Sequence, residues 1–185
     1  MGNICNKEKS DPVNMKLKTT SVKRNTLESI SGYENSINLS NFIIRGNLGK
    51  GSFGKVYLVE SKEDSCYYAM KILNKVKIKE NDLIENTKVE RIILSTLSFP
   101  FIVNLHSSFQ TNNRLFIITE YIEGGDLFHL ILKLGRFNHE QIKLYAAEII
   151  LSLDYLHKNN CIYRDLKPEN IFLTADLRAK LGDFG

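Results

Sequence analysis

Three glycines between two strand-like segments constrain the fold of this chain more than any other feature. Gly49, Gly51 and Gly54 form the pattern G-x-G-x-x-G within the stretch LGKGSFGKVYLVE. The residues after the third glycine, KVYLV, alternate and include β-branched types, which is typical of a strand. A dinucleotide-binding turn would need a helix to begin at that glycine, so we expect a strand–loop–strand hairpin.

The glycines of this hairpin are suited to binding phosphates. Without a Cβ atom, the backbone amides of a loop can approach phosphate oxygens closely. On this motif alone, a glycine-rich hairpin without any ligand remains the alternative interpretation.

One lysine lies inside the next strand-like segment, YYAMKIL. The neighbours of Lys71, Met70 and Ile72, are both apolar, so this strand is expected to be buried on both faces. A buried ammonium group needs an anionic partner.

A predicted helix in the segment LIENTKVERIILSTL offers that partner. Its apolar residues recur at helical spacing, and Glu90 falls near the same face. We therefore expect an ion pair between Lys71 and Glu90, with a solvated helical glutamate as the alternative. The residues of the apolar face are Val89, Ile92, Ile93 and Leu97.

Two polar motifs near the end of the sequence suggest chemistry on phosphate. YRDLKPEN contains Asp165, Lys167 and Asn170, and an Asp-Phe-Gly triplet begins at Asp183. Asp165 can orient the proton of a hydroxyl group, and Lys167 can neutralise charge on a phosphoryl group. Asn170 and Asp183 can hold magnesium through hard oxygen ligands. One such aspartate alone would be interpreted as a turn residue.

Taken in order, these motifs resemble those of the protein kinase family. The resemblance covers residues 41–185 and implies an α+β, protein-kinase-like fold. Residues 41–122 would form the N-terminal lobe, an antiparallel sheet plus one helix, together with the hinge. Residues 123–185 would form the first part of the helical C-terminal lobe. The implied cofactors are ATP and Mg²⁺; the implied catalytic residues are Lys71, Glu90, Asp165 and Lys167, and the implied metal ligands are Asn170 and Asp183.

The resemblance also implies which residues contact ATP. The backbone of Glu120 and Ile122 would meet the adenine edge, with Thr119 as the gatekeeper behind it. Asp126 would face the ribose, and Phe172 would lie below the adenine, where an aliphatic residue is common in the family. The full implied set is Leu48, Gly49, Lys50, Gly51, Ser52, Phe53, Gly54, Val56, Ala69, Lys71, Thr119, Glu120, Ile122, Asp126 and Phe172.

Further details narrow the class that the chain resembles. Lys167, two residues after Asp165, is similar to serine/threonine kinases rather than tyrosine kinases. Tyr163 in place of the usual His, with GKGSFGKV, EYIEGGDLF and GRF, resembles the AGC group, which includes cyclic-nucleotide-dependent kinases. The implied reaction transfers the γ-phosphoryl of Mg-ATP to Ser or Thr of a protein substrate. Asp126 and Glu169 match positions that attract substrate arginine in basophilic relatives, and a solvated acidic surface is the alternative.

The first 40 residues differ in composition from the rest of the chain. Residues 1–24 carry the whole formal net charge of +4, and Tyr33 is the only aromatic residue before position 41. Such a segment cannot bury enough apolar surface to offset the entropy lost on ordering. We expect residues 1–40 to be a flexible basic tail.

The opening MGNICN resembles an acylation signal. Gly2 would carry myristate and Cys5 palmitate, although Asn6 stands where the pattern has Ser or Thr. One acyl chain binds membranes only marginally, so the second chain or the basic segment would be needed. An ordinary unmodified start is the alternative.

The location and partners follow from what the sequence contains. The chain has no apolar run of about 20 residues and no secretory signal, so we expect a cytoplasmic protein, anchored at the cytoplasmic face if acylated. Protein substrates and a membrane surface are the expected partners, and no nucleic acid is expected.

Other functional classes remain open on the sequence alone. A nucleotide-binding or scaffold protein with kinase architecture but no turnover is the alternative, and a dinucleotide enzyme is remote. A chain that stops after Asp-Phe-Gly would lack the activation segment, so residues 1–185 by themselves are expected to be inactive. We also expect Phe184 to be partly exposed. A helix is expected over residues 138–158, where Asn138 with Gln141 resembles a capping box. The apolar stripe of this helix is Ile142, Tyr145, Ile149, Leu153 and Leu156.

Overall fold

The computed structural model describes residues 37–50 and 54–184. Most of the predicted basic tail, including Gly2 and Cys5, therefore lies outside the described residues, as do Gly51, Ser52 and Phe53 of the glycine loop. A 3-10 helix, Leu39–Asn41, precedes the first strand, and the side chain of Asn38 caps it.

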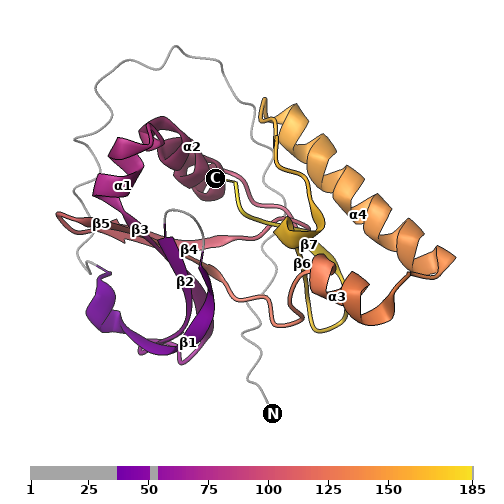
Figure 1. Ribbon diagram of the computed structural model, residues 1–185, viewed down its shortest axis with the longest axis horizontal. Helices are drawn as coiled ribbons and strands as arrows, with labels where there is room; N and C mark the ends of the chain where they lie inside the picture. Colours follow the sequence, from indigo (N-terminus) through magenta and orange to yellow (C-terminus); the bar gives the residue numbers. More distant parts are fainter. Residues whose placement is uncertain (1–36, 51–53, 185) are drawn as a thin grey trace.

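A five-stranded antiparallel sheet forms the first half of the fold (Figure 1). Its spatial order is β1-β2-β3-β5-β4. The β1–β2 hairpin around the glycine motif confirms the strand–loop–strand prediction. The strands are β1 (Phe42–Lys50), β2 (Gly54–Ser61), β3 (Tyr67–Asn74), β4 (Leu105–Gln110) and β5 (Arg114–Glu120).

Two helices connect β3 to β4, where one was predicted, and they lie on one side of the sheet (Figure 1). They are α1 (Lys75–Glu80) and α2 (Ile84–Thr96). The predicted apolar face of α2 was partly wrong, because Val89 and Ile92 are 44% and 58% exposed. The buried side chains are Glu90 and Leu94, one turn apart. The face of α2 toward the sheet is thus centred on the glutamate.

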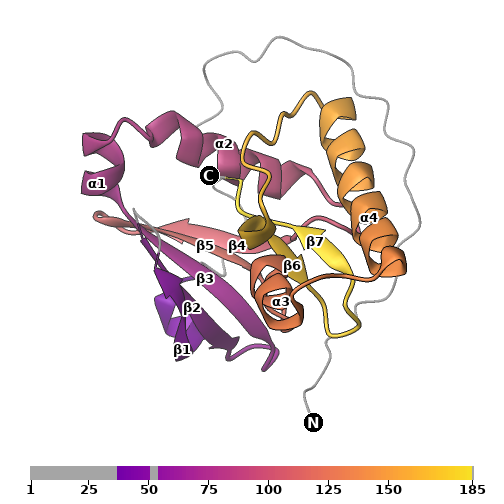
Figure 2. The same cartoon turned by 45° about the vertical axis from the view of Figure 1, so that its right-hand side comes forward.

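The second half of the described chain is helical, with a small two-stranded sheet (Figure 2). Its elements are α3 (Leu127–Leu134), α4 (His139–Lys158), the 3-10 helix Pro168–Asn170, β6 (Ile171–Leu173) and β7 (Ala179–Leu181). Together with the five-stranded sheet and α2, they form the N-terminal lobe and the start of the C-terminal lobe of the predicted fold.

The capping box predicted for α4 is present. Asn138 accepts from the Gln141 amide at 2.9 Å, and the Gln141 side chain accepts from the Asn138 amide at 3.0 Å. The predicted stripe is correct at Tyr145 and Leu156, which are buried, but wrong at Ile142, which is 51% exposed. Ile142 lies in the first turn of the helix, where the apolar core does not reach it.

Two apolar cores lie on opposite faces of the five-stranded sheet. Along β5, Ile117 belongs to one core while Phe116 and Ile118 belong to the other, as the alternation of side chains in a strand requires. The first core also contains Leu94 of α2 and Leu156 of α4. This shared core joins the two halves of the fold on the side where β6 and β7 lie.

A buried carboxylate fixes β7 against α4. Glu148 is almost fully buried, and its side chain accepts from the Ala179 amide at 2.7 Å and from the Arg178 guanidinium. A buried charge is tolerated only when it is paired and hydrogen-bonded. This contact positions the chain two residues before Leu181 and four before Asp183.

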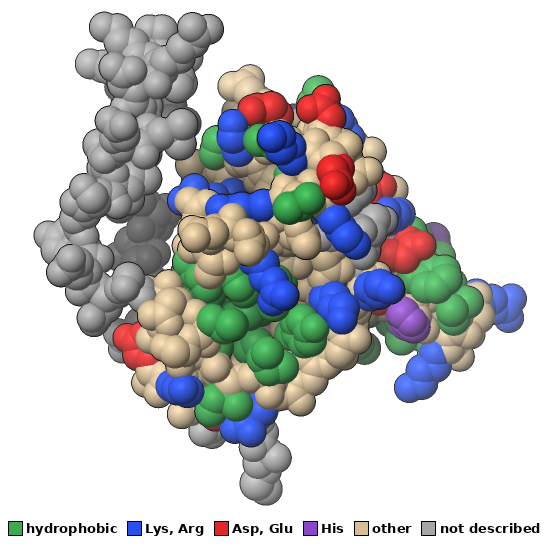
Figure 3. Space-filling view, turned by 60° about the vertical axis from the view of Figure 1, so that its left-hand side comes forward, with side chains coloured by type: hydrophobic (Ala, Val, Ile, Leu, Met, Phe, Trp, Pro, Cys, Tyr) green, Lys and Arg blue, Asp and Glu red, His purple; other side chains and the backbone are tan. Residues whose placement is uncertain are grey.

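Figure 3 views the molecule from the side on which β1 and α1 lie. Apolar side chains gather there in one area, with Lys and Arg side chains around them. The exposed apolar residues of this half include Ile43, Ile44 and Val76. Within the described ranges, no helix combines the length and the hydropathy needed to cross a bilayer.

Candidate nucleotide-binding and phosphotransfer site

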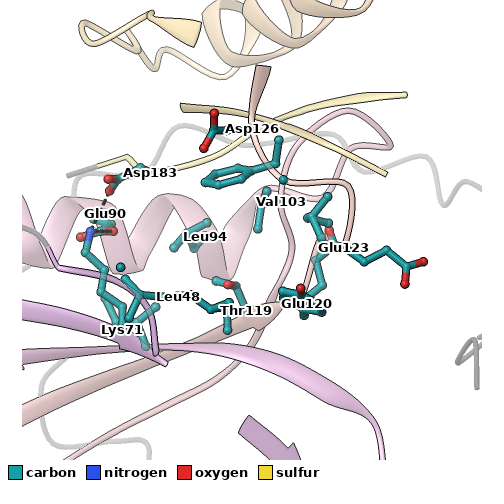
Figure 4. Close-up of a pocket in the computed structure, with 18 residues that line it drawn as sticks. Leu48, Lys71, Glu90, Leu94, Val103, Thr119, Glu120, Glu123, Asp126 and Asp183 are labelled. Atoms are coloured by element: carbon teal, nitrogen blue, oxygen red, sulfur yellow. Dashed lines mark hydrogen bonds and ion pairs between the residues drawn. The ribbon is translucent and has the colours of Figure 1, made fainter. Parts of the chain in front are cut away.

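A cavity of about 320 Å³ lies between the five-stranded sheet and the segment that carries α3 and β6. β1, β2 and β3 line it from one side, and Phe172 and Asp183 line it from the other. Figure 4 shows Lys71, Glu90 and Asp183 converging at one end, with Thr119 and Glu120 at the opposite end. The cavity therefore has a charged end and a hinge end.

Lys71 joins two carboxylates at the charged end. Its Nζ atom lies 2.7 Å from Glu90 Oε1 and 2.7 Å from Asp183 Oδ1. The Lys71–Glu90 ion pair was predicted from the sequence and is confirmed. The contact with Asp183 was not predicted, and it brings the Asp-Phe-Gly segment against the sheet and α2.

Burial shifts the pKa values of Lys71 and Glu90 in opposite directions, because it disfavours the charged form of each. Burial opposes the charge on Lys71, but the carboxylates of Glu90 and Asp183 outweigh it and raise the pKa of the ammonium group. Burial raises the pKa of Glu90, and Lys71 offsets part of that rise. Lys71 therefore stays cationic, as required of a group that would hold phosphates.

The predicted catalytic loop brings three side chains together. Lys167 Nζ donates to Asp165 Oδ2 at 2.6 Å, and Asn170 Nδ2 donates to the same oxygen at 3.0 Å. The hydrogen bond from Lys167 lowers the pKa of Asp165, and Asn170 adds to the effect. Asp165 is thus held ionised and oriented, with its side chain half exposed to solvent.

The backbone segments that carry the two predicted metal ligands lie side by side. The Gly182 amide donates to the Asn170 carbonyl at 3.0 Å, so Asn170 adjoins the residue before Asp183. Among the described residues, no group of three or more His, Cys, Asp or Glu side chains could hold a metal ion. The pair fits Mg²⁺, which is usually held by one or two protein ligands together with substrate phosphates and water.

Tyr163 fixes the position of the Asp-Phe-Gly segment through its hydroxyl group and its ring. Its hydroxyl donates to the Gly182 carbonyl and, at 3.2 Å, to the Asp183 carbonyl. Its ring packs edge-on against Phe184 at 5.2 Å between centroids. The expectation that Phe184 is partly exposed was wrong, because Phe184 is 8% exposed and belongs to the core.

The described glycines of the loop have different roles. A Cβ atom at Gly54 would lie 2.3 Å from the Ile72 carbonyl oxygen, so this glycine is required by the packing of β2 on β3. A Cβ atom at Gly49 would meet nothing within 4 Å, and Gly49 lines the cavity. Only Gly49 of these two is placed to admit a ligand.

The side chain of Glu120 is occupied by the protein itself. Glu120 Oε1 accepts from the Asn104 amide at 2.8 Å, and Lys180 Nζ lies 2.7 Å from the same oxygen. The Glu120 amide also donates to the Asn104 carbonyl at 3.0 Å, and the contact of the Glu120 backbone with adenine stays a prediction. Lys180 of β7 and Glu120 of β5 thus tie the two halves together at the hinge end.

Asp126 is also held by nearby groups. Its Oδ1 atom accepts from the His129 amide at 2.8 Å and caps α3, and His129 Nδ1 lies 2.8 Å from both carboxylate oxygens. Asp126 lines the cavity, and its contact with a ribose stays a prediction. Glu169, the other predicted substrate contact, is exposed to solvent.

The cavity includes most of the predicted ATP contacts and some residues that the sequence did not indicate. Leu94 could have been found, since it follows Glu90 by one helical turn. Val103 lies in a loop, and no pattern pointed to it. Lys50 and Gly54 are not among the described residues that line it. The predicted ATP contacts that line the cavity are Leu48, Gly49, Val56, Ala69, Lys71, Thr119, Glu120, Ile122, Asp126 and Phe172. Glu90 and Asp183, predicted for other roles, also line it, and the remaining lining residues are Leu94, Val103, Ile117, Tyr121, Glu123 and Gly125.

Residues 42–185 match the family model of the protein kinase domain. The chain belongs to the protein kinase family. It is 48% identical over 149 residues to "Protein kinase 3" of Dictyostelium discoideum, a match that covers 80% of this chain and 16% of that protein.

Two further kinase relatives are cyclic-AMP-dependent. The chain is 46% identical over 138 residues to the "cAMP-dependent protein kinase catalytic subunit" of Dictyostelium discoideum, covering 75% of this chain and 21% of that protein. It is 46% identical over 147 residues to "cAMP-dependent protein kinase type 3" of Saccharomyces cerevisiae, a match that covers 80% of this chain and 37% of that protein. These relatives confirm the resemblance to the AGC group, and the chain spans only a minor part of their length.

Proposed function

We propose that the complete protein is an ATP-dependent protein serine/threonine kinase. It transfers the γ-phosphoryl of Mg-ATP to the hydroxyl of a serine or threonine in a protein substrate. The observation that carries this proposal is the position of Lys71, which joins Glu90 and Asp183 at the charged end of a cavity whose other end is the hinge.

The charged end provides the groups that phosphoryl transfer requires. Lys71 is cationic and faces the cavity, so it can hold phosphate oxygens. Asp165 can orient the substrate hydroxyl and accept its proton, and Lys167 can stabilise charge on the transferred group. Asn170 and Asp183 would hold Mg²⁺, which would neutralise the charge that develops on the phosphates.

The hinge end provides a site for the adenine. Leu48, Val56 and Ala69 make one apolar wall, and Phe172 makes the other. The backbone of Glu120 and Ile122 borders the same space. Apolar walls with a few polar groups that fix orientation are typical of small-molecule sites.

A preference for basic substrates is part of this proposal. Asp126 and Glu169 are acidic and lie beside the cavity or the catalytic loop. Carboxylates attract the guanidinium of arginine and can bind it through two hydrogen bonds. We expect the preferred substrates to carry arginine shortly before the phosphorylated residue.

Membrane attachment is a separate part of the proposal, and it rests on the sequence alone. Gly2 and Cys5 would each carry an acyl chain, and the basic segment after them would be attracted to anionic lipids. The kinase would then act at the cytoplasmic face of a membrane.

The acceptor class is the sharpest test of the proposed function. The complete protein is incubated with γ-labelled ATP and three peptides that differ only in Ser, Thr or Tyr at the acceptor position. We expect label on the serine and threonine peptides when Mg²⁺ is present and none when it is chelated. Label on the tyrosine peptide alone, or transfer without a divalent cation, would overturn the assignment.

A further inference from the structure

Phe172 lies on the wall of the cavity that faces β1, β2 and β3. It is the middle residue of β6 and pairs with Lys180 of β7. Its ring is partly buried, and it borders the same space as Leu48, Val56 and Ala69. A flat ring that enters between these walls would meet the phenyl ring on one side.

Gly182 lies behind that ring, away from the cavity. A Cβ atom at position 182 would lie 2.7 Å from Phe172 Cε2 and 2.9 Å from Phe172 Cδ2. It would also lie 3.0 Å from Val103 Cγ2. Gly182 is buried and does not line the cavity, so the phenyl ring covers it.

The backbone at position 182 does not itself require glycine. The described glycines with positive φ are Gly125 and Gly135, so Gly182 has a conformation open to other residues. The reason for glycine at this position is room. A side chain there would collide with the phenyl ring, so the ring would have to move, because a packed interior transmits a change of even one methyl group.

We infer that Phe172 and Gly182 act as a coupled pair that sets the affinity of the base site for an adenine ring. This inference rests on the proposed function, because it needs an adenine nucleotide in the cavity. Phe172 supplies an aromatic face on which a planar base stacks, and Gly182 keeps that face low enough for the base to enter. Phe172 is the residue that touches the ligand, and Gly182 is a positioning residue that acts through it.

The aromatic face has a measurable consequence for affinity. Offset stacking between rings adds stabilisation beyond that of burial alone, and it corresponds to roughly 2- to 10-fold in binding. Replacing Phe172 by leucine keeps an apolar wall and removes the stacking. It also removes Cε2, the atom nearest to a Cβ at position 182.

Titration calorimetry tests the coupling between Phe172 and Gly182. It measures the affinity of the complete protein for a non-hydrolysable ATP analogue in the presence of Mg²⁺. We expect Phe172→Leu to weaken binding about 2- to 10-fold. Gly182→Ala alone should weaken it by about 10-fold or more, since the ring that lines the base site has to move. The double variant should lose less affinity than the sum of the two single losses, because leucine lacks Cε2, the atom nearest to the new methyl group, while Val103 Cγ2 stays close. Additive losses would overturn the pair.

Gly46→Ala is the matched control. A Cβ atom at Gly46 would meet nothing within 4 Å, and this residue of β1 does not line the cavity. Its affinity for the analogue should equal that of the wild type. If Gly182→Ala does not fold, a folded double variant supports the pair, and a double variant that also fails to fold contradicts it.

A spectroscopic readout separates stacking from a purely structural role. In the wild-type complex, the NMR signals of the adenine H2 and H8 protons should lie upfield of their positions in the free analogue, because these protons would lie over the phenyl ring. The same protons should move much less in the Phe172→Leu complex. Equal shifts in both complexes would overturn the aromatic role of Phe172. If the wild type binds no adenine nucleotide, both the proposed function and the Phe172–Gly182 pair are overturned. If the wild type binds normally and the losses in the variants are additive, only the pair is overturned.

Discussion

Lys71 Nζ donates to Asp183 Oδ1 at 2.7 Å, although the two residues are 112 positions apart. Lys71 belongs to the five-stranded sheet, and Asp183 follows β7 (Figure 2). The contact places Lys71, the proposed phosphate-binding cation, beside a predicted metal ligand. It therefore closes the charged end of the cavity with groups from both halves of the fold.

Replacing Lys71 by methionine should destabilise the fold in a pH-dependent way. The Glu90 side chain is 5% exposed, and without Lys71 its charge would be buried and unpaired. Removing one partner of such a pair costs about 3 kcal/mol of unfolding free energy at neutral pH. Urea unfolding of wild type and variant measures this difference.

The sign of the pH dependence follows from the pKa of Glu90. Burial already raises this pKa, and the loss of Lys71 raises it further. A carboxyl whose pKa is raised by folding carries no penalty when it is protonated in both states. Its penalty grows as the pH rises from the pKa of the unfolded chain to the raised pKa of the folded protein, and is complete above that. The gap between wild type and variant should therefore be smaller at pH 5 than at pH 8. Lys88→Met, at an exposed pair with Glu85, should change stability little at either pH. An equal gap at both pH values would contradict the account.

Lys167 should control the acid side of the pH profile. Its hydrogen bond lowers the pKa of Asp165, so Lys167→Met should raise that pKa toward its ordinary value. The proposed reaction needs Asp165 in its ionised form. The acid limb of the pH profile of kcat/KM should therefore move to higher pH in the variant, and kcat/KM should also fall. Lys158→Met, which breaks only an exposed pair with Asp154, is the control and should leave the profile in place. An unmoved acid limb in Lys167→Met would show that Asp165 does not govern it.

Glu169 should be the main residue that binds an arginine of the substrate. Its carboxylate is exposed, whereas Asp126 already accepts from the amide of His129 and contacts its ring. We expect Glu169→Gln to lower the preference for an arginine peptide over its alanine counterpart up to about 5-fold, the range of an exposed charge pair. Asp126→Asn should lower it less. The ratio of kcat/KM for the two peptides is the measurement, and a profile indifferent to arginine in the wild type would remove this part of the proposal.

Acylation predicts a change of location rather than of activity. Gly2→Ala and Cys5→Ser each remove one of two anchoring signals, and a single acyl chain binds membranes only marginally. Each variant should therefore move from the membrane fraction to the soluble fraction of cells. Ser10→Ala, in the same segment, should not. Unchanged fractionation of both variants would end the proposal of a lipid anchor.

The sequence predicted the parts of the site that depend on local patterns. The glycine hairpin, the Lys71–Glu90 pair and the capping box at Asn138 each follow from spacing within one or two elements, and each is present. These features need only strand alternation, helical periodicity and cap chemistry.

Contacts between distant segments were not predictable in the same way. Glu120 with Lys180, and Gly182 beneath Phe172, depend on how β5, β6 and β7 meet in space. The position of Phe184 was mistaken because its burial comes from Tyr163, which lies 21 positions earlier and packs against its ring. Single-sequence patterns describe faces and caps, but not which faces meet.

The rate of γ-phosphoryl transfer to a serine peptide, measured for the complete protein and for its Asp183→Ala variant, tests the central claim most directly. Asp183 is placed as a metal ligand and as a partner of Lys71, and loss of such electrostatic stabilisation lowers kcat by on the order of 100-fold or more. We expect robust Mg-ATP-dependent transfer by the wild type and at most about one hundredth of that rate in the variant. A variant that transfers phosphate at near wild-type rates would contradict the account.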